Sequence, residues 1–180
     1  MPRCLAHVRA ALLAVTCFTL AAPLLAQTPA AAAVQATSPT AAPAALRGTT
    51  LDGQTFDLAR LRDKVVLLVF WSTECAVCRD KMPELRANVK GWQGQPFEVI
   101  GVSTDRDRRA LMSYQQLVNI SIPASQRFTT LWRGEAGHQD SFGNAGVLPA
   151  AFLIDKQGKV VESYHGRIPP ETWDRIAELL

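Results

Sequence analysis

The chain has 180 residues, of which 48% are hydrophobic and 19% are charged, a composition that fits one globular domain with additional N-terminal sequence. The formal net charge is +3, and removal of Arg3 and Arg9 with a leader peptide would leave 17 basic residues against 16 acidic ones. A net charge this small gives no support for a partner that is a nucleic acid or an anionic membrane surface.

The first 26 residues have the layout of a secretory signal peptide. Basic residues at Arg3 and Arg9 precede an uncharged, Ala- and Leu-rich segment from Ala10 to Ala26. We therefore predict export to the periplasm with cleavage after Ala26. An uncleaved N-terminal membrane anchor is the alternative, because the apolar segment is only slightly shorter than the ~20 residues of a spanning helix.

Residues 27–45 are dominated by Ala, Pro, Thr and Gln and carry no charge. They are predicted to form a flexible linker, because they cannot bury enough apolar surface to offset their chain entropy. The folded domain is expected over residues 46–180. Its first element is a predicted β-hairpin over Leu46–Leu61, since the Asp52-Gly53 pair is a strong hairpin signal.

A buried strand followed by a helix is predicted at the centre of the chain. The continuous apolar segment Val65–Trp71 is rich in β-branched and aromatic residues, which is typical of a strand buried on both faces. After a short polar step, Cys75 and Cys78 stand at the start of a predicted helix that contains Pro83. The free N–H groups and the dipole at a helix N-terminus favour negative charge, so this position lowers the pKa of a thiol.

Spacing and position favour redox chemistry for this cysteine pair. Cys4 and Cys17 fall in the predicted signal peptide, so one pair remains in an oxidising compartment. With two residues between them, the thiols can close a disulfide ring, and the second can attack a mixed disulfide formed on the first. We assign Cys75 as the nucleophile and Cys78 as the resolving cysteine.

A structural disulfide and a metal half-site are the alternatives for the pair. A structural zinc site needs four ligands. Beyond its carboxylates, the exported chain offers only Cys75, Cys78, His138 and His165. We therefore predict neither a metal site nor a cofactor.

The remaining pattern predicts alternating strands and helices. The expected elements are a strand at Phe97–Ser103, a helix from about Asp107 to Val118 capped by Thr104-Asp105, a short strand around Ile120–Ile122, a loop over Thr129–Asn144, a hairpin of Ala150–Ile154 with Lys159–Tyr164, and an amphipathic helix at Ile168–Leu180. This order predicts an α/β fold with a central mixed β-sheet and helices on both faces.

The sequence FWSTECAVCRDKMPEL and the segment Gly146–Asp155 resemble two motifs of the thioredoxin superfamily, specifically of its exported TlpA/ResA-like thiol-disulfide oxidoreductases. FWSTECAVCRDKMPEL at residues 70–85 is similar to the usual FWATWCPPCRAEMPEL of that family, and Gly146–Asp155 is similar to its G-x-P-T-T-F-L-I-D. The resemblance covers about residues 46–180 and implies a thioredoxin-like fold with an N-terminal β-hairpin. It also implies that Pro149 is a cis-proline facing the cysteines, and that Leu148, Pro149 and Trp71 bind substrate.

The resemblance further implies a direction for the reaction and the partners in it. Members of this family mostly act as reductases, so we expect disulfide-containing exported proteins as substrates and a thiol-reducing membrane protein as electron donor. Two other classes stay open. Ser72-x-x-Cys75 weakly mimics the peroxidatic motif of a peroxiredoxin, which would have antioxidant activity, and a copper chaperone could use two thiolates on the same scaffold.

Three positions depart from the family pattern: Glu74 replaces the usual Trp, Ala76 a frequent Pro, and Lys81 a frequent carboxylate. An anion at position 74 opposes thiolate formation and so raises the pKa of Cys75. If the side chain points to solvent, screening removes most of this effect. Glu74 is therefore predicted to modulate the cysteine pair.

Overall fold

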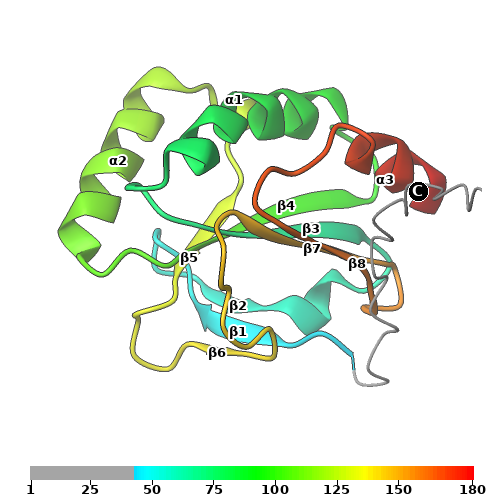
Figure 1. The fold of residues 1–180 in the computed structure, drawn as a ribbon, viewed down its shortest axis with the longest axis horizontal. Helices are drawn as coiled ribbons and strands as arrows, with labels where there is room; N and C mark the ends of the chain where they lie inside the picture. Colours follow the sequence, from blue (N-terminus) through cyan, green and yellow to red (C-terminus); the bar gives the residue numbers. More distant parts are fainter. Residues whose placement is uncertain (1–42) are drawn as a thin grey trace, which may run out of the picture. The chain divides into compact units, whose positions relative to one another are not determined.

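The computed structural model describes residues 43–180 (Figure 1). The predicted signal peptide over residues 1–26, with Cys4 and Cys17, and most of the predicted linker over residues 27–45 lie outside the described residues. Within the described part, packing against the domain is already present at Ala44, which is buried and donates its N–H to the carbonyl of Gly158 at 3.0 Å.

A five-stranded mixed sheet forms the centre of the domain (Figure 1). Its strand order is β5 (Thr129–Trp132), β4 (Phe97–Ser103), β3 (Val65–Trp71), β7 (Ala150–Ile154) and β8 (Val160–His165). Strands β3, β4 and β5 are parallel, while β7 and β8 are antiparallel to their neighbours. The central strand is β3, and all seven of its residues are buried, as the continuous apolar segment predicts.

Successive side chains of β3 point to opposite faces of the sheet and enter two separate cores. Leu67 and Val69 pack in the core beneath the three α-helices, α1 (Ala76–Gly91), α2 (Arg108–Ser121) and α3 (Thr172–Leu179). Leu68 and Phe70 pack in the core of the other face. That face is covered by the 3-10 helix η1 (Leu58–Leu61) and by a small sheet of β2 (Thr55–Asp57), β1 (Leu46–Thr49) and β6 (Gln139–Asp140). Figure 1 shows the α-helices above the central sheet and the small sheet below it.

These layers confirm the prediction of a mixed sheet flanked by helices with an N-terminal β-hairpin. The finer expectation of helices on both faces needs a correction, because the second face carries η1 and strands in place of another α-helix. The predicted hairpin is β1 and β2, whose turn is closed by a hydrogen bond of 2.9 Å from the N–H of Thr50 to the carbonyl of Gln54. Gly53 has φ +83° in this turn, a conformation that favours glycine.

The segment between β4 and β7 departs most from the predictions. Helix α2 is capped by Asp107, whose carboxylate accepts from the N–H of Arg109, and it continues to Ser121, so the predicted strand at Ile120–Ile122 is wrong. The strand is instead β5, within the segment predicted as a loop. Residues of β5 pair with β4 and form a bridge with Thr50 of the hairpin. These partners are distant in sequence, so local periodicity did not reveal the strand.

The C-terminal helix begins four residues later than predicted. It starts at Thr172, after Pro169 and Pro170, which lack the backbone donors of a regular helix. Ile176 is buried as expected, whereas Ala177 is exposed.

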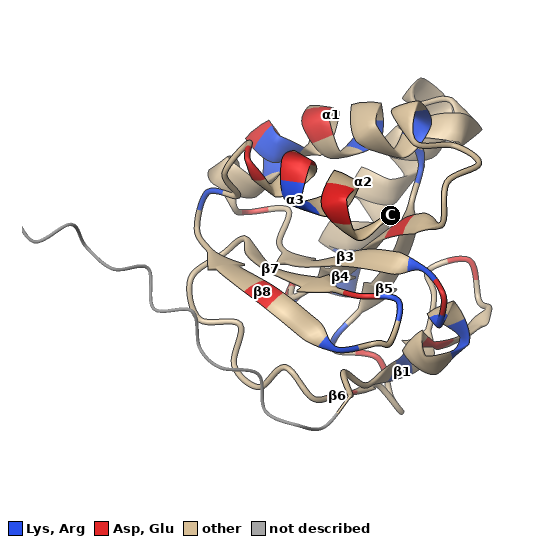
Figure 2. Ribbon diagram, turned by 90° about the vertical axis from the view of Figure 1, so that its right-hand side faces the viewer, with Lys and Arg blue, Asp and Glu red and all other residues tan. Residues whose placement is uncertain are grey.

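Acidic and basic residues are interspersed along the helices rather than being separated by sign (Figure 2). None of the helices within residues 43–180 has the length and apolar character needed to cross a membrane.

Candidate active site

The two cysteines are joined by a disulfide at the N-terminus of α1. Cys75 is the N-cap residue, and its Sγ lies 3.1 Å from the backbone nitrogen of Cys78. Cys75 is half-buried, whereas Cys78 is 1% exposed. When the pair is reduced, the N–H groups of the first turn and the helix dipole stabilise negative charge at Cys75. Only the sulfur of Cys75 is then open to an incoming disulfide.

A buried carboxylate holds the loop that leads from β3 to Cys75. Asp105 is 7% exposed, and its Oδ1 accepts from Ser72 Oγ at 2.8 Å, from Thr73 N–H at 2.9 Å and from Thr73 Oγ1 at 2.7 Å. Its Oδ2 accepts from Ser103 Oγ at 2.6 Å. Ser72 Oγ in turn accepts from the N–H of Glu74 at 3.1 Å. The loop between β3 and Cys75 is therefore hydrogen-bonded to the carboxylate of Asp105 at every residue, Ser72 and Thr73 directly and Glu74 through the hydroxyl of Ser72.

Sequence reasoning assigned Asp105 to a helix cap and missed this role. The signal that could have found it is the placement of polar residues at the ends of two strands. Ser72 and Thr73 follow β3, and Ser103 and Asp105 end β4 or follow it. Because β3 and β4 are parallel neighbours, their carboxyl ends meet at one edge of the sheet.

The segment containing Leu148 and Pro149 lies at the same edge. Strand β7 pairs antiparallel with β3, with Ala150 opposite Phe70, so the residues before Ala150 lie beside the chain that runs toward Cys75. The Leu148–Pro149 peptide bond is cis. Pro149 accepts at its carbonyl from the N–H of Gly166 at 2.8 Å, while no backbone hydrogen bond within residues 43–180 involves Leu148. The main chain of Leu148 is thus unpaired next to the cysteine loop.

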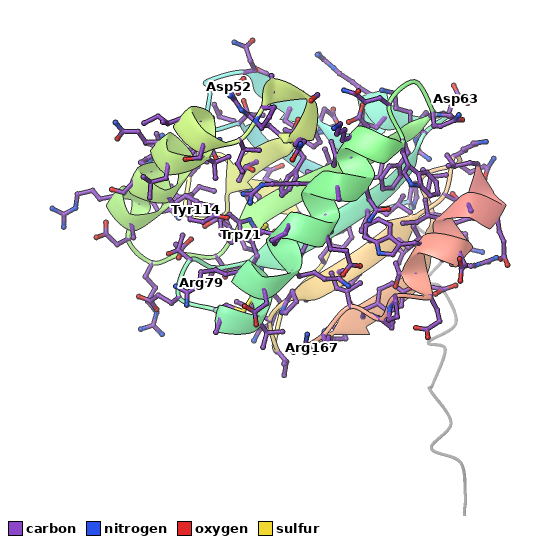
Figure 3. The ribbon with its side chains drawn as sticks, turned by 90° about the horizontal axis from the view of Figure 1, so that it is seen from above. Asp52, Asp63, Trp71, Arg79, Tyr114 and Arg167 are labelled. Atoms are coloured by element: carbon purple, nitrogen blue, oxygen red, sulfur yellow. A yellow bond between two sulfur atoms is a disulfide. The ribbon has the colours of Figure 1, made fainter. Side chains whose placement is uncertain are left out.

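Of the two other residues predicted for the site, one is exposed and the other is buried. Glu74 is exposed, one residue before Cys75. Trp71 is 1% exposed, and its ring lies 5.1 Å from that of Tyr114, centroid to centroid, in the core beneath α1 (Figure 3). The expectation that Trp71 binds substrate therefore needs a correction: position 71 still belongs to the buried strand, and the chain reaches the surface only after it.

Lys81 is the third departure from the family pattern, and it lies in an interface between α1 and α3. Its Nζ contacts Glu84 Oε1 at 2.7 Å, and the Lys81 side chain is 10% exposed. Trp173 of α3 donates its indole N–H to the same carboxylate. Desolvation by burial raises the pKa of Glu84, but the hydrogen bonds from Lys81 and Trp173 outweigh it and hold that pKa below its usual value. The ammonium of Lys81 is therefore neutralised within the helix pair.

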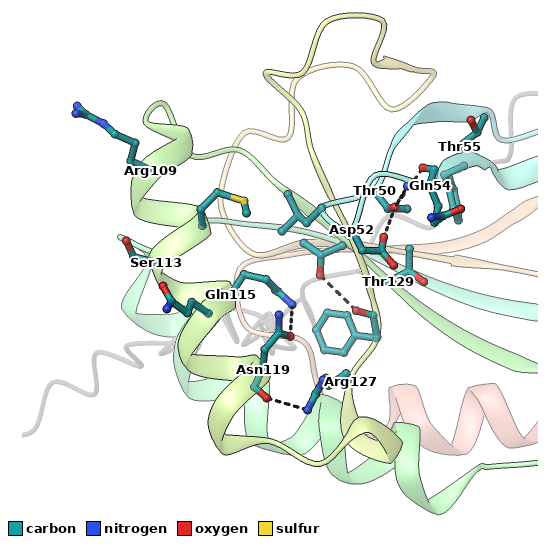
Figure 4. Close-up of a pocket in the computed structure, with 16 residues that line it drawn as sticks. Thr50, Asp52, Gln54, Thr55, Arg109, Ser113, Gln115, Asn119, Arg127 and Thr129 are labelled. Carbon is teal, nitrogen blue, oxygen red and sulfur yellow. Dashed lines mark hydrogen bonds between the residues drawn. The ribbon is translucent and has the colours of Figure 1, made fainter.

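One wide cavity lies away from the cysteines. It has a volume of about 1120 Å³ and lies between the hairpin turn, α2 and the start of β5 (Figure 4). Polar groups around it bond to one another, including Gln115 to Asn119 at 3.2 Å and Arg127 to the carbonyl of Asn119 at 2.9 Å. Neither cysteine nor Leu148 lines it, so it is not the redox site. Residues 43–180 also contain no cluster of three or more His, Cys, Asp or Glu residues placed to hold a metal ion.

Comparison with known proteins agrees with this geometry. The sequence model of the AhpC/TSA family matches residues 38–163. The chain is 30% identical over 118 residues to a thiol-disulfide oxidoreductase ResA of Bacillus cereus, covering 66% of this chain and 64% of that protein. It is 32% identical over 120 residues to the ResA of Bacillus anthracis, with the same coverage of 66% and 64%. The match thus spans just under two thirds of these curated relatives.

A solved structure shows the same fold. The thiol:disulfide interchange protein of the thioredoxin family from Chlorobium tepidum TLS superposes with a TM-score of 0.60 at 25% sequence identity. The superposition covers 78% of this chain and 95% of that one. The described domain is therefore thioredoxin-like.

Proposed function

The chain belongs to the AhpC/TSA family. From the geometry of its cysteine pair we propose that it is a thiol-disulfide oxidoreductase of the cell envelope that reduces disulfides in exported proteins. One observation carries the proposal: an accessible Cys75 caps α1 and is bonded to a buried Cys78. The names of the similar curated proteins support the same reaction class.

The reaction follows from this asymmetry between the two sulfurs. The Cys75 thiolate attacks one sulfur of the substrate disulfide, which breaks that bond, forms a mixed disulfide and releases the other substrate sulfur as a thiol after it takes a proton. The Cys78 thiolate then attacks Cys75 and releases the second substrate thiol. Two electrons pass to the substrate, and the Cys75–Cys78 disulfide remains. A dithiol donor at the membrane returns the two electrons.

Substrate is proposed to bind along Leu148 and Pro149. The unpaired main chain of Leu148 beside the cysteine loop suits an extended substrate segment, which would add to it as a strand would. Hydrogen bonds to main chain select no particular sequence, which fits an enzyme that acts on more than one exported protein.

Glu74 is proposed to modulate Cys75. Its carboxylate is exposed and adjacent in sequence to the nucleophile, so it opposes the thiolate and raises the pKa of Cys75. Glu74→Gln should lower that pKa at low ionic strength. The difference should shrink in about 1 M salt, where the screening length is only ~3 Å. An unchanged titration at low salt would remove Glu74 from the mechanism.

A redox titration of the folded protein, read by thiol trapping, tests the proposal. A midpoint below about −220 mV would support a reductase, whereas one near about −120 mV would indicate an oxidant. Cys75→Ser should abolish disulfide reduction, and Cys78→Ser should accumulate the mixed disulfide. Absence of a reversible disulfide would contradict the proposal.

The other two candidate functions predict different results. A peroxidase should turn over peroxide with Cys78→Ser, yet the Ser72 hydroxyl of the peroxidatic pattern is engaged by Asp105. A copper chaperone should bind Cu(I) tightly without disulfide exchange.

A further inference from the structure

A second cavity adjoins the proposed substrate edge. It is open to solvent and has a volume of about 420 Å³. Three segments line it: Thr104–Arg106 after β4, Trp132–Gly134 at the end of β5, and Asn144, Ala145, Gly146 and Leu148 before β7. Leu148 therefore belongs both to this cavity and to the main-chain edge next to the cysteine loop. A substrate segment lying along Leu148 would pass the mouth of the cavity.

Trp132 forms a fixed wall of this cavity. Its indole N–H donates to the carbonyl of Asp105 at 2.7 Å. This bond fixes the ring against the residue whose carboxylate binds the loop before Cys75. The guanidinium of Arg108 lies 5.6 Å from the centre of the ring and pairs with Glu135 at 3.1 Å. These contacts hold the indole without filling the cavity, so the cavity is ready to accept a side chain.

The unpaired positive charge of the cavity comes from one arginine, while the buried carboxylate of Asp105 keeps its negative charge and directs both oxygens at neutral donors in Ser72, Thr73 and Ser103. Of the three charged residues that line it, Arg133 is neutralised by two contacts of 2.9 Å with Asp140. The carboxylate of Asp105 is buried and already accepts four hydrogen bonds. Arg106 is exposed, and it makes no ion pair or side-chain hydrogen bond with any residue in the range 43–180. Its positive charge is therefore available to a ligand.

Two other acids, one next to Arg106 in the sequence and one after β5, are paired with other arginines. Asp107 accepts from the backbone N–H of Arg109 at 2.9 Å as the cap of α2, and it pairs with the side chain of Arg109 at 3.4 Å. Glu135 is paired with Arg108, as described above. An incoming anion therefore meets an unneutralised guanidinium beside an aromatic wall, at a place where side chains of an extended segment point alternately toward and away from the protein.

We propose that this cavity is a specificity subsite that takes an acidic side chain, Asp or Glu, of the substrate segment next to its disulfide-bonded cysteine. Arg106 is the specificity-determining residue. The inference rests on the proposed function, since it names the class of exported protein that the cysteine pair prefers. A substrate with Lys or Arg at the same position is disfavoured by like charge.

Reduction of matched peptides by the reduced full-length protein tests this subsite. The peptides carry one intramolecular disulfide and differ only in the residue flanking the cysteine, which is Glu, Gln or Lys. We expect kcat/KM to be about 2- to 5-fold higher for Glu than for Gln, the range of a solvent-exposed ion pair, and lower for Lys. Arg106→Ala should abolish the preference, so that the ratio of kcat/KM for the Glu peptide to that for the Gln peptide falls to about 1, and Arg106→Glu should reverse it toward Lys.

Arg60→Ala is the matched control, because Arg60 is an exposed arginine of η1 on the opposite face of the sheet. It should preserve the preference for Glu. The subsite is refuted if wild type does not discriminate among the peptides, if Arg106→Ala retains the preference, or if Arg60→Ala loses it equally. In these cases the Gln peptide is still reduced and the proposed function stands. Failure of wild type to reduce any peptide refutes the proposed function, and the subsite with it.

Discussion

Replacing the buried carboxylate of Asp105 tests whether the loop before Cys75 is held in place by that side chain. Asp105→Asn keeps the size of the side chain but removes its negative charge and one of its two accepting oxygens. The four hydrogen bonds of 2.6 to 2.9 Å that reach this carboxylate come from Ser72, Thr73 and Ser103. At least one donor must turn away from the amide, so the free energy of unfolding should fall by about 1.5–3 kcal/mol, the worth of a hydrogen bond to a charged group.

The same change acts on Cys75 through space. Asp105 Oδ1 lies 2.9 Å from the nitrogen of Thr73, and two residues of chain span at most ~7 Å, which places Cys75 within roughly 10 Å of the carboxylate. At that distance, an effective dielectric constant of about 20 to 80 gives roughly 0.4–1.7 kcal/mol. Loss of the charge should therefore lower the pKa of reduced Cys75 and raise its thiolate fraction about 2- to 20-fold at a pH well below that pKa.

The rate of Cys75 alkylation as a function of pH measures the thiolate, and denaturant unfolding measures stability. Asp107→Asn is the matched control, because this exposed carboxylate caps α2 only two residues away. The control retains a side chain that caps α2, because Asn caps a helix about as well as Asp, and it should leave the alkylation profile unchanged. If Asp105→Asn altered neither the profile nor the stability, or if both variants shifted the profile alike, Asp105 would not position the cysteine loop.

Three further predictions concern the domain around the site. Leu85→Ala should lower the free energy of unfolding by about 2–5 kcal/mol, because Leu85 is 1% exposed in the core beneath α1, and a loss below ~1 kcal/mol in urea unfolding would contradict this packing. Gly158→Ala should destabilise by about 1 kcal/mol or more, because Gly158 has φ +75° and the added Cβ would meet Arg62; a stabilised variant would show that the turn has another conformation. Burial, followed by the hydrogen bond to Glu162, raises the pKa of Tyr164 to about 12. Since the folded state then holds the phenol proton more tightly than the unfolded chain, stability should fall between about pH 10 and pH 12, and Tyr164→Phe should lose this component of the decline.

Local patterns in the sequence were sufficient for the elements that carry the cysteines. The limits of β3 and β4, the Asp52-Gly53 turn and the start of α1 after Cys75 all follow from runs of side chains within a few residues of one another. Such patterns determine the local secondary structure and burial, so the sequence alone predicts that the redox pair lies at a helix N-terminus.

Tertiary structure decided what surrounds the pair. Strand β5 forms because β4 and Thr50 pair with it. Asp105 binds the loop before Cys75 because the carboxyl ends of the parallel strands β3 and β4 lie side by side. Trp71 is in the core because α1 and α2 cover it, and Arg106 faces a cavity because loops after β4 and β5 meet the one before β7. Each of these roles depends on partners tens of residues away, and pairing between such partners is selected by the packing of the whole domain rather than by the residues of one segment.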